Sequence, residues 1–388
     1  MFCLPLIFWL GSLMNAQPRP TFKAQTIDSS ISIGYGLALA DVDGDGRTDI
    51  LLADKKQIVW YRNPDWKKTV MAENLTKYDN VCIAAADIDG DGKAEVAVGA
   101  QWNPGETSNA EESGAVFYLQ RPADLTKSWT PIRLAHEPTV HRMRWVKAND
   151  GKYFLLVLPL HGRGNVSGKG AGVKFLAYSV PVQKDSDWPL YLLDSSHHMT
   201  HNFHPYISAK NKQATGIYIA SAEGVRFIGD TIPRRKWYDA KMFSGIDHGA
   251  GEIKVGEAGG NANFVATVEP MHGNNIVVYH PGNKMERLVL DTNIKEGHAL
   301  GVADFLGTGS EQIVAGWRGP NGTNETGIRM YYLTGKDTRN WITAWVDQNG
   351  IACEDIQVAD LNADGKPDIV ASGRATKNVK VYWNKSSK

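Results

Sequence analysis

The stretch Asp41-Val-Asp-Gly-Asp-Gly-Arg-Thr-Asp49 recurs in this chain as Asp87-Ile-Asp-Gly-Asp-Gly-Lys-Ala-Glu95 and as Asp360-Leu-Asn-Ala-Asp-Gly-Lys-Pro-Asp368. Oxygen side chains at alternate positions of such a loop converge on one hard cation, and a glycine permits the sharp bend. Apolar runs with the pattern of strands flank all three loops, whereas an EF-hand loop has helices at both ends. The loops therefore predict turns between paired strands of a β-propeller.

We expect each of these acidic loops to hold a structural Ca²⁺ ion near the rim of the propeller. The predicted ligands are the side chains at alternate positions, namely Asp41, Asp43, Asp45, Asp49, Asp87, Asp89, Asp91, Glu95, Asp360, Asn362, Asp364 and Asp368. The alternative is a turn held by Asx hydrogen bonds without metal. Under either interpretation the loops stabilise the scaffold.

The apolar runs repeat seven times, and each repeat has the pattern of short strands separated by turns. Inner strands are expected to begin near residues 37, 81, 141, 200, 251, 298 and 354. The seventh repeat ends near Trp383 without a fourth strand, and a strand-like segment without a partner, 21–27, precedes the first repeat. Pairing these two segments closes the ring and removes an exposed sheet edge. The predicted fold is an all-β, seven-bladed β-propeller of four-stranded antiparallel blades, with 17–388 as one domain.

The composition bounds the partners and the location of the protein. The 42 Lys and Arg residues balance 42 Asp and Glu residues, so nothing favours nucleic acid or an anionic membrane. Residues 1–16 resemble a secretory signal peptide, with a buried strand or an uncleaved anchor as the alternative. No later segment has the ~20 apolar residues that span a bilayer. We expect a secreted or periplasmic protein in which Cys82 and Cys353 are buried free thiols.

In a propeller, the loops entering the inner strands share one face with the loops between the second and third strands. Eight of the 11 histidines map to that face, opposite the acidic loops: His141, His161, His197, His198, His201, His248, His272 and His298. Imidazole accepts a proton near neutral pH or binds a metal, and arginine supplies fixed positive charge. The chain lacks a Gly-x-Ser-x-Gly elbow, a Gly-rich phosphate loop and a His-Glu-x-x-His motif. Serine hydrolysis, phosphoryl transfer and hydride transfer therefore have no support.

The acidic loops resemble FG-GAP/VCBS repeats over the whole mature chain. The segments 194–203, 248–253, 296–299, 352–355 and 373–378, among them Asp194-Ser-Ser-His-His-Met-Thr-His-Asn-Phe203, resemble the seven-bladed propeller domain of aldos-2-ulose dehydratase. That resemblance implies dehydration of keto-sugars such as 1,5-anhydrofructose with a divalent metal. The dehydratase carries cupin domains after its propeller and this sequence does not, so an isomerase step housed there is not expected. Propeller polysaccharide lyases, such as ulvan lyase and rhamnosyl-glucuronate lyase, are a looser resemblance.

Both resemblances imply removal of a proton beside a carbonyl or carboxylate, followed by loss of a β-oxygen substituent. We expect His141 or His201 as the base and His298 as a partner, with a metal ion or arginine stabilising the enolate oxygen. The predicted substrate contacts are Trp102, His161, Arg163, Trp317, Arg318, Glu354 and Arg374. The candidate ligands of a central divalent metal (Zn²⁺, Mg²⁺ or Ca²⁺) are His198, His248 and Glu252.

The function expected from this pattern is a secreted carbohydrate lyase or dehydratase that acts on a keto-sugar by β-elimination. One alternative is a uronate-specific polysaccharide or oligosaccharide lyase. Another is hydrolysis of a glycoside, which requires paired carboxylates ~5–9.5 Å apart. The last is a non-catalytic propeller that binds glycan or protein.

Overall fold

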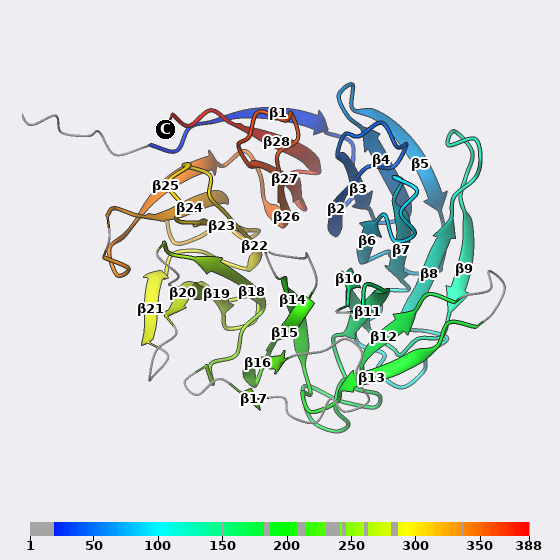
Figure 1. Ribbon diagram of the computed structural model, residues 1–388. Helices are drawn as coiled ribbons and strands as arrows, with labels where there is room; N and C mark the ends of the chain where they lie inside the picture. Colours follow the sequence, from blue (N-terminus) through cyan, green and yellow to red (C-terminus); the bar gives the residue numbers. More distant parts are fainter. Residues whose placement is uncertain are drawn as a thin grey trace, which may run out of the picture.

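Seven four-stranded antiparallel sheets stand around a central channel in the computed structural model (Figure 1). The structure describes residues 19–387 except 149, 182–186, 208–213, 230–240, 243–245, 260–262, 281–285 and 336. The expected signal peptide lies outside the described residues. The predicted all-β, seven-bladed propeller is confirmed.

Each sheet is one blade, with its inner strand at the channel and its outer strand at the rim. The strands of blades 1 to 3 are β2 Gly36–Ala40, β3 Asp49–Ala53, β4 Gln57–Arg62 and β5 Lys67–Glu73, then β6 Cys82–Ala86, β7 Glu95–Ala100, β8 Ala115–Gln120 and β9 Thr130–Leu134, then β10 Val140–Lys147, β11 Tyr153–Pro159, β12 Phe175–Ser179 and β13 Leu190–Asp194. Hairpins connect the strands of each blade in chain order.

Blades 4 to 7 repeat the same order. Their strands are β14 Thr200–Ile207, β15 Ala214–Ser221, β16 Gly224–Gly229 and β17 Lys241–Met242, then β18 Glu252–Glu257, β19 Asn263–Glu269, β20 Asn275–His280 and β21 Glu286–Asp291, then β22 Gly297–Ala303, β23 Gln312–Trp317, β24 Gly327–Leu333 and β25 Trp341–Gln348, then β26 Cys353–Ala359, β27 Asp368–Gly373, β28 Asn378–Asn384 and β1 Phe22–Asp28. The last blade thus takes its outer strand from the start of the described chain.

The ring closes through the pairing of β1 with β28, as the sequence predicted. The two strands run antiparallel from the pair Phe22 and Asn384 onward. Beyond the strands, the amide of Lys385 donates to the carbonyl of Thr21 at 2.8 Å. Figure 1 shows the blue first strand lying along the red last strand. Because this pairing uses the free edge of blade 7, the seven sheets form a closed ring.

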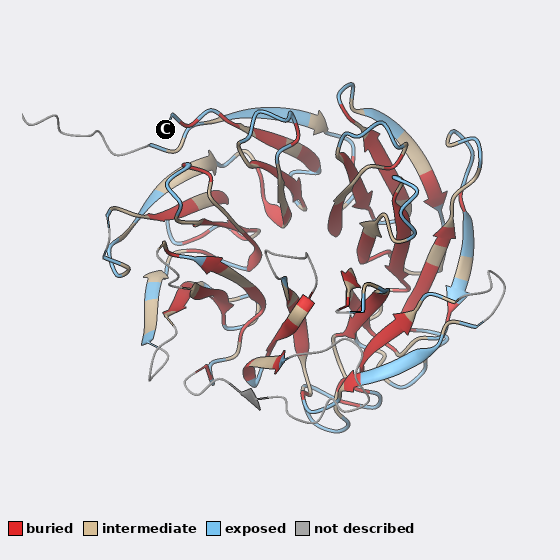
Figure 2. Cartoon of the chain, in the orientation of Figure 1, coloured by how far each residue is buried: buried red, intermediate tan, exposed pale blue. Residues whose placement is uncertain are grey.

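The core lies between the blades, where the second and third strands of each sheet are buried (Figure 2). All five residues of β3 and all six of β7 are buried, whereas four of the seven residues of β1 are exposed. Strands buried on both faces read as continuous apolar runs, which explains why the sequence shows the repeat so clearly. Cys82 and Cys353 are buried in inner strands and unpaired, as expected.

A tyrosine and a carboxylate link neighbouring blades at three positions. Tyr61, Tyr331 and Tyr382 each donate a hydrogen bond of 2.7 Å to an aspartate from the outer strand of the preceding blade. The accepting residues are Asp28, Asp291 and Asp347, and each also pairs with a Lys or Arg at 2.8 or 2.9 Å. Buried donors aimed at a charged acceptor set the rotation of one blade on the next.

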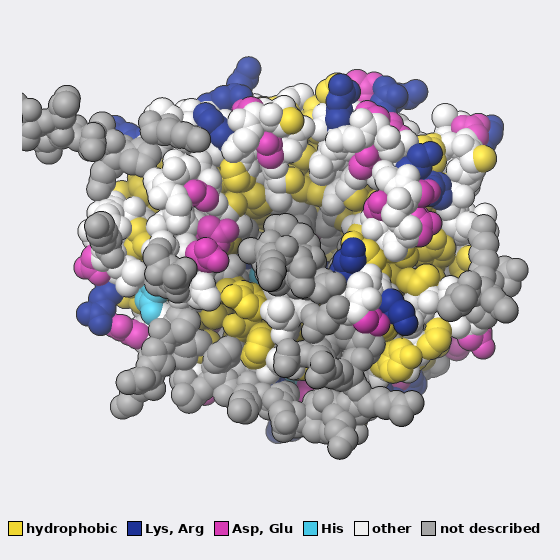
Figure 3. All heavy atoms as spheres, viewed as in Figure 1, with side chains coloured by type: hydrophobic (Ala, Val, Ile, Leu, Met, Phe, Trp, Pro, Cys, Tyr) yellow, Lys and Arg dark blue, Asp and Glu magenta, His cyan; other side chains and the backbone are white. Residues whose placement is uncertain are grey.

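The visible face of the molecule has acidic and basic side chains interspersed over it (Figure 3), in line with the balanced composition. Across the described residues, no helix has the length and hydropathy required to cross a bilayer.

Candidate active site at the mouth of the channel

The second residues of four inner strands converge at one end of the channel. These residues are His141 in β10, His201 in β14, His298 in β22 and Glu354 in β26, and all four are buried. Each blade repeats the same strand geometry, so residues at the same position of successive inner strands lie at the same height around the channel. The face on which they lie is opposite the acidic loops, as the order of strands and turns requires.

The three histidines of the inner strands each donate from one ring nitrogen to a backbone carbonyl of the next blade. His141 Nδ1 bonds the carbonyl of His201 at 2.9 Å, His201 Nδ1 that of Gly251 at 2.9 Å, and His298 Nδ1 that of Glu354 at 2.6 Å. A carbonyl only accepts, so each Nδ1 carries the proton and each Nε2 keeps a lone pair. Burial lowers the pKa of all three imidazoles well below the usual range, which keeps them neutral.

Another histidine, His272, forms a group of three imidazoles with His201 and His298. His272 lies in the turn between β19 and β20, with a φ of 50°. One nitrogen each from His201, His272 and His298 lies within 4.8 Å of the others. His272 Nε2 and His201 Nε2 are 2.6 Å apart. Burial and the neighbouring His201 lower the pKa of His272 to about 3. Three neutral imidazoles with converging ring nitrogens form a donor set suited to Zn²⁺ or a similar transition metal.

His141 lies beside this group but faces other partners. Its ring centroid is 4.6 Å from that of His201, and the indole of Trp102 stacks on it at 5.0 Å with an interplanar angle of 28°. The guanidinium of Arg142 lies 3.1 Å from His141 Nε2. Since Nδ1 is already the donor to the carbonyl of His201, Nε2 accepts this bond from Arg142 through its lone pair.

Two arginines converge on Glu354, which is 2 % exposed. Arg374 donates to its carboxylate at 2.9 Å, and Arg318 donates at 3.1 and 3.3 Å. The guanidinium of Arg374 also lies 5.2 Å from the ring centroid of Tyr35. The carboxylate therefore holds two fixed positive charges at the mouth of the channel, next to the imidazole group.

Glu252 is the acidic residue on the histidine side of the mouth. It is buried, which raises the pKa of its carboxyl, while Arg142 opposes that effect. Asn202 donates to one oxygen at 2.5 Å. The other oxygen lies 3.1 Å from His201 Nδ1 without hydrogen-bond geometry, because that N–H points to Gly251. Glu252, which the sequence predicted as a metal ligand, thus lies beside the three-imidazole group. The atoms that converge in that group are nitrogens of His201, His272 and His298.

Several residues predicted for this site lie elsewhere on the same face. His198 bonds Glu223 at 2.9 Å, and His248 is 57 % exposed beside Asp247, so neither joins the imidazole group. Arg163 pairs with Glu137 at 3.0 Å. His161 buries Nδ1, which has no hydrogen-bond partner among the described residues.

Trp317, which the sequence predicted as a substrate contact, lies inside blade 6, away from the channel mouth. Trp317 is 0 % exposed, and its indole N–H donates to the carbonyl of Glu325 at 2.9 Å. The ring packs against Trp345, with centroids 5.4 Å apart, inside blade 6. As the last residue of β23, it alternates inward, and a buried ring offers no face to a sugar.

The acidic loops are organised by their own backbone. Asp41 accepts bonds of 2.7 Å from the amides of Gly44 and Gly46, and Asp360 accepts from Gly365 at 2.8 Å. In each of two loops, three carboxylates lie within 4.8 Å of one another, close enough to share a cation. These are Asp41, Asp43 and Asp45 in the first loop, and Asp87, Asp89 and Glu95 in the second. Asp91 of the second loop is paired with Arg121, and the side chains of Asn362 and Asp364 in the third loop bond each other at 3.2 Å.

The closing carboxylates of the first and third loops have a further role. Asp49 accepts from the amides of Val42 and Asn63, and Asp368 from those of Leu361 and Asn384. Both are fully buried, and burial raises the pKa of Asp49 to about 6. They tie each loop to the strand behind it.

Reasoning from sequence left His272 and Arg142 out of the site. His272 maps to the correct face, but its turn carries no motif that distinguishes it from a solvated loop histidine. Arg142 follows His141 directly, and alternation along a strand assigns the two side chains to different surfaces. In the channel, however, the long guanidinium turns back to reach the neighbouring ring.

Comparison with known proteins agrees with this description. Residues 21–98 match the FG-GAP-like repeat, 83–119 the FG-GAP repeat, and 113–281 the β-propeller domain of aldos-2-ulose dehydratase. No curated protein matches the chain significantly. The last of these family matches suggests a carbohydrate-active propeller.

Solved structures share the fold at low identity. A chain of the mitotic checkpoint complex is 11% identical, with a TM-score of 0.57 over 99% of this chain and 96% of that chain. The domain BBS1N in complex with ARL6DN is 12% identical, with a TM-score of 0.56 over 94% and 97%. The exotype rhamnogalacturonan lyase YesX is 12% identical, with a TM-score of 0.50 over 96% and 75%. The protein is a seven-bladed β-propeller with FG-GAP repeats, part of which matches the β-propeller domain of aldos-2-ulose dehydratase.

Proposed function

We propose that this protein is a carbohydrate lyase of the dehydratase type, which removes a β-oxygen substituent from a keto-sugar at the mouth of the channel. The observation that carries the proposal is the group of three neutral imidazoles, His201, His272 and His298, beside a fourth imidazole and a pair of arginines. The match of residues 113–281 to the dehydratase propeller domain supports the same chemistry.

His201, His272 and His298 would hold a divalent transition metal. The fit rests on geometry and protonation: His201 and His298 donate Nδ1–H to backbone carbonyls, which leaves their Nε2 lone pairs for a metal, and His272 Nε2 lies 2.6 Å from His201 Nε2. Burial lowers the pKa of all three imidazoles and so favours the neutral form that binds a metal. When bound, such a metal supplies Lewis-acid polarisation of a carbonyl oxygen.

The residues of the chain account for the proton transfers. The C–H bond next to the carbonyl breaks, and His141 Nε2 takes the proton in the place now occupied by Arg142. Trp102, stacked on His141, supplies a flat apolar surface beside that carbon. Arg318 and Arg374, held by Glu354, neutralise the negative charge that develops on the substrate.

The elimination is completed by loss of the β-oxygen. A carbon–carbon double bond forms, the carbon–oxygen bond breaks, and the departing oxygen takes a proton. Tyr35 is a donor suited to this step, because burial and Asp79 raise the pKa of its hydroxyl to about 12 and so keep it protonated. Its ring lies under Arg374, on the arginine side of the mouth.

The experiment that tests the proposal is turnover of keto-sugars, followed by the ultraviolet absorbance of the conjugated enone. Wild-type protein loaded with Zn²⁺ is compared with His141→Ala and His201→Ala. We expect His141→Ala to lose turnover while it keeps its metal, and His201→Ala to lose both. Full turnover in both variants, or no new chromophore on any keto-sugar, contradicts the proposal.

A uronate lyase is distinguished in the same assay. Its product, an unsaturated uronide, absorbs at shorter wavelength than an enone from a keto-sugar. The match of residues 113–281 to the dehydratase propeller domain is what favours the keto-sugar over a uronate.

A further inference from the structure

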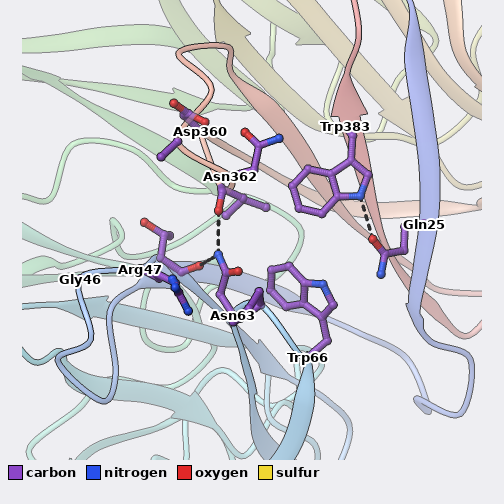
Figure 4. Close-up of a pocket in the computed structure, with 12 residues that line it drawn as sticks. Gln25, Gly46, Arg47, Asn63, Trp66, Asp360, Asn362 and Trp383 are labelled. Carbon is purple, nitrogen blue, oxygen red and sulfur yellow. Dashed lines mark hydrogen bonds between the residues drawn. The ribbon is translucent and has the colours of Figure 1, made fainter.

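A second pocket lies on the opposite face of the propeller, where blade 7 meets blade 1. We propose that it binds one neutral pyranose residue of a glycan chain, as a site separate from the channel mouth. The pocket has a volume of about 400 Å³, within the range of small-molecule sites. It is lined by residues of the first and third acidic loops, of the turn after β4, and of β1 and β28 (Figure 4).

Two half-buried tryptophans form the apolar wall of the pocket. Trp66 and Trp383 have ring centroids 6.3 Å apart and an interplanar angle of 44°, so they form a corner instead of a closed stack. The indole N–H of Trp383 donates to the side chain of Gln25 at 2.8 Å, which fixes its plane (Figure 4). Other tryptophans, such as Trp129 and Trp317, are fully buried in the core. Flat rings held at a pocket wall suit the apolar face of a sugar.

The backbone conformation of Trp66 indicates that its position is maintained at a cost. Its φ is 55°, a left-handed conformation that a large side chain rarely adopts. Its amide bonds the carbonyl of Arg62 at 2.6 Å, which closes the turn. Strained residues of this kind concentrate at binding sites, where the surrounding structure holds them.

The floor of the pocket is rigid and joins the two blades. Asn63 is buried and donates from Nδ2 to the carbonyls of Thr48, at 3.0 Å, and of Leu361, at 2.8 Å (Figure 4). One side chain thus bonds both acidic loops. The pocket is therefore preformed, and binding does not have to order it.

The polar rim favours a neutral sugar over a charged ligand. Asn362 and Arg47 offer side-chain donors, and the amide nitrogen of Gln25 is available because its oxygen accepts from Trp383. The positive charge of Arg47 is opposed by Asp45, 3.8 Å away, and the oxygens of Asp360 at the same pocket already accept backbone N–H groups. Amide groups around aromatic rings match sugar hydroxyls, whereas a proline-rich peptide, the other ligand of tryptophan pairs, needs a longer groove.

The test is native affinity electrophoresis in gels that contain mixed-linkage β-glucan, xylan or galactomannan. Trp66→Asn removes the ring and keeps a residue that tolerates the left-handed backbone, and Trp66→Phe keeps a flat ring. Asn362→Ala removes one rim donor at an exposed position. We expect one glycan to retard the wild type, with affinity about tenfold weaker in Trp66→Asn. Trp66→Phe should retain most of the binding.

A reciprocal control separates this pocket from the proposed active site. His201→Ala should bind the glycan as the wild type does, and Trp66→Asn should turn over a small soluble substrate at the wild-type rate. Equal retardation of the wild type and Trp66→Asn overturns the proposal. So does the absence of retardation in all three glycans, or binding of a proline-rich peptide in their place. The glycan-binding outcomes do not depend on whether the channel mouth is catalytic.

Discussion

The carboxylate of Glu354 offers the sharpest test of the geometry at the channel mouth. Replacing it with glutamine keeps the shape of the side chain, so no cavity forms. The change removes the negative charge that accepts from Arg374 at 2.9 Å and from Arg318 at 3.1 and 3.3 Å. It also places the side-chain N–H₂ donor of the glutamine next to the two guanidinium groups, which have no acceptor atom for it.

The magnitude follows from burial. Removing one partner of a buried ion pair costs about 3–5 kcal/mol, because the other charge is left uncompensated. Glu354 is 2 % exposed, but Arg374 is 39 % exposed and recovers hydration when it is released. We therefore expect Glu354→Gln to lower the free energy of unfolding by about 3 kcal/mol, at the lower end of that range.

A matched control is an ion pair with the same N···O distance in which the carboxylate is exposed to solvent. Arg339 and Glu286 are 2.9 Å apart, with Glu286 51 % exposed. Because exposed pairs contribute little, Glu286→Gln should cost about 0.5 kcal/mol or less. Urea unfolding followed by tryptophan fluorescence measures both variants at a common m value. If Glu354→Gln were no more destabilising than Glu286→Gln, the account of a buried carboxylate holding two arginines would be refuted.

Three further predictions address the metal sites and the channel. His272→Ala should weaken Zn²⁺ binding by more than the roughly 10–100-fold typical of losing an outer partner, while exposed His248→Ala changes nothing; competition with a chromophoric chelator measures both. Ca²⁺ at a hundred times its Kd should raise the free energy of unfolding by about 2.7 kcal/mol per site, and Asp89→Ala should remove one such increment. Asp304 lies in the turn between β22 and β23, which lacks the alternating acidic residues, so Asp304→Ala should leave the Ca²⁺ response intact. Burial, aided by Arg144, lowers the pKa of Lys254 to about 8. Because the unfolded chain binds more protons at this site between pH 8 and 10.5, stability should rise across that window by about 3 kcal/mol, and Lys254→Met should abolish the rise in urea titrations.

Much of the fold could be predicted because each blade is formed mainly by strands that follow one another in the sequence. The acidic loops mark where an inner strand ends and the second strand begins, and the short continuous apolar runs between turns then locate the strands. The same phase placed His141, His201, His298 and Glu354 on one face, because the second position of every inner strand is equivalent. Pairing of β1 with β28 followed from counting strands.

The parts of the site that sequence reasoning missed depend on how one blade meets another. His272 Nε2 lies 2.6 Å from His201 Nε2 because the turn after β19 in blade 5 packs next to the inner strand of blade 4. Arg142 reaches His141, and Trp317 turns into its own blade, through rotamers that local periodicity does not specify. Likewise, Trp66 and Trp383 are 317 residues apart and meet only where the ring closes.

By itself, then, the sequence determined the class of fold, the number of blades and the face on which each polar residue lies. Those properties depend on strand alternation and turn chemistry, which act within a few residues. The tertiary structure alone decided which imidazoles converge, which carboxylate holds the arginines, and which tryptophans stay at a pocket wall. Those properties depend on the angle and distance between blades, set by the packed cores and by bonds such as Tyr331 to Asp291, and no short segment encodes them.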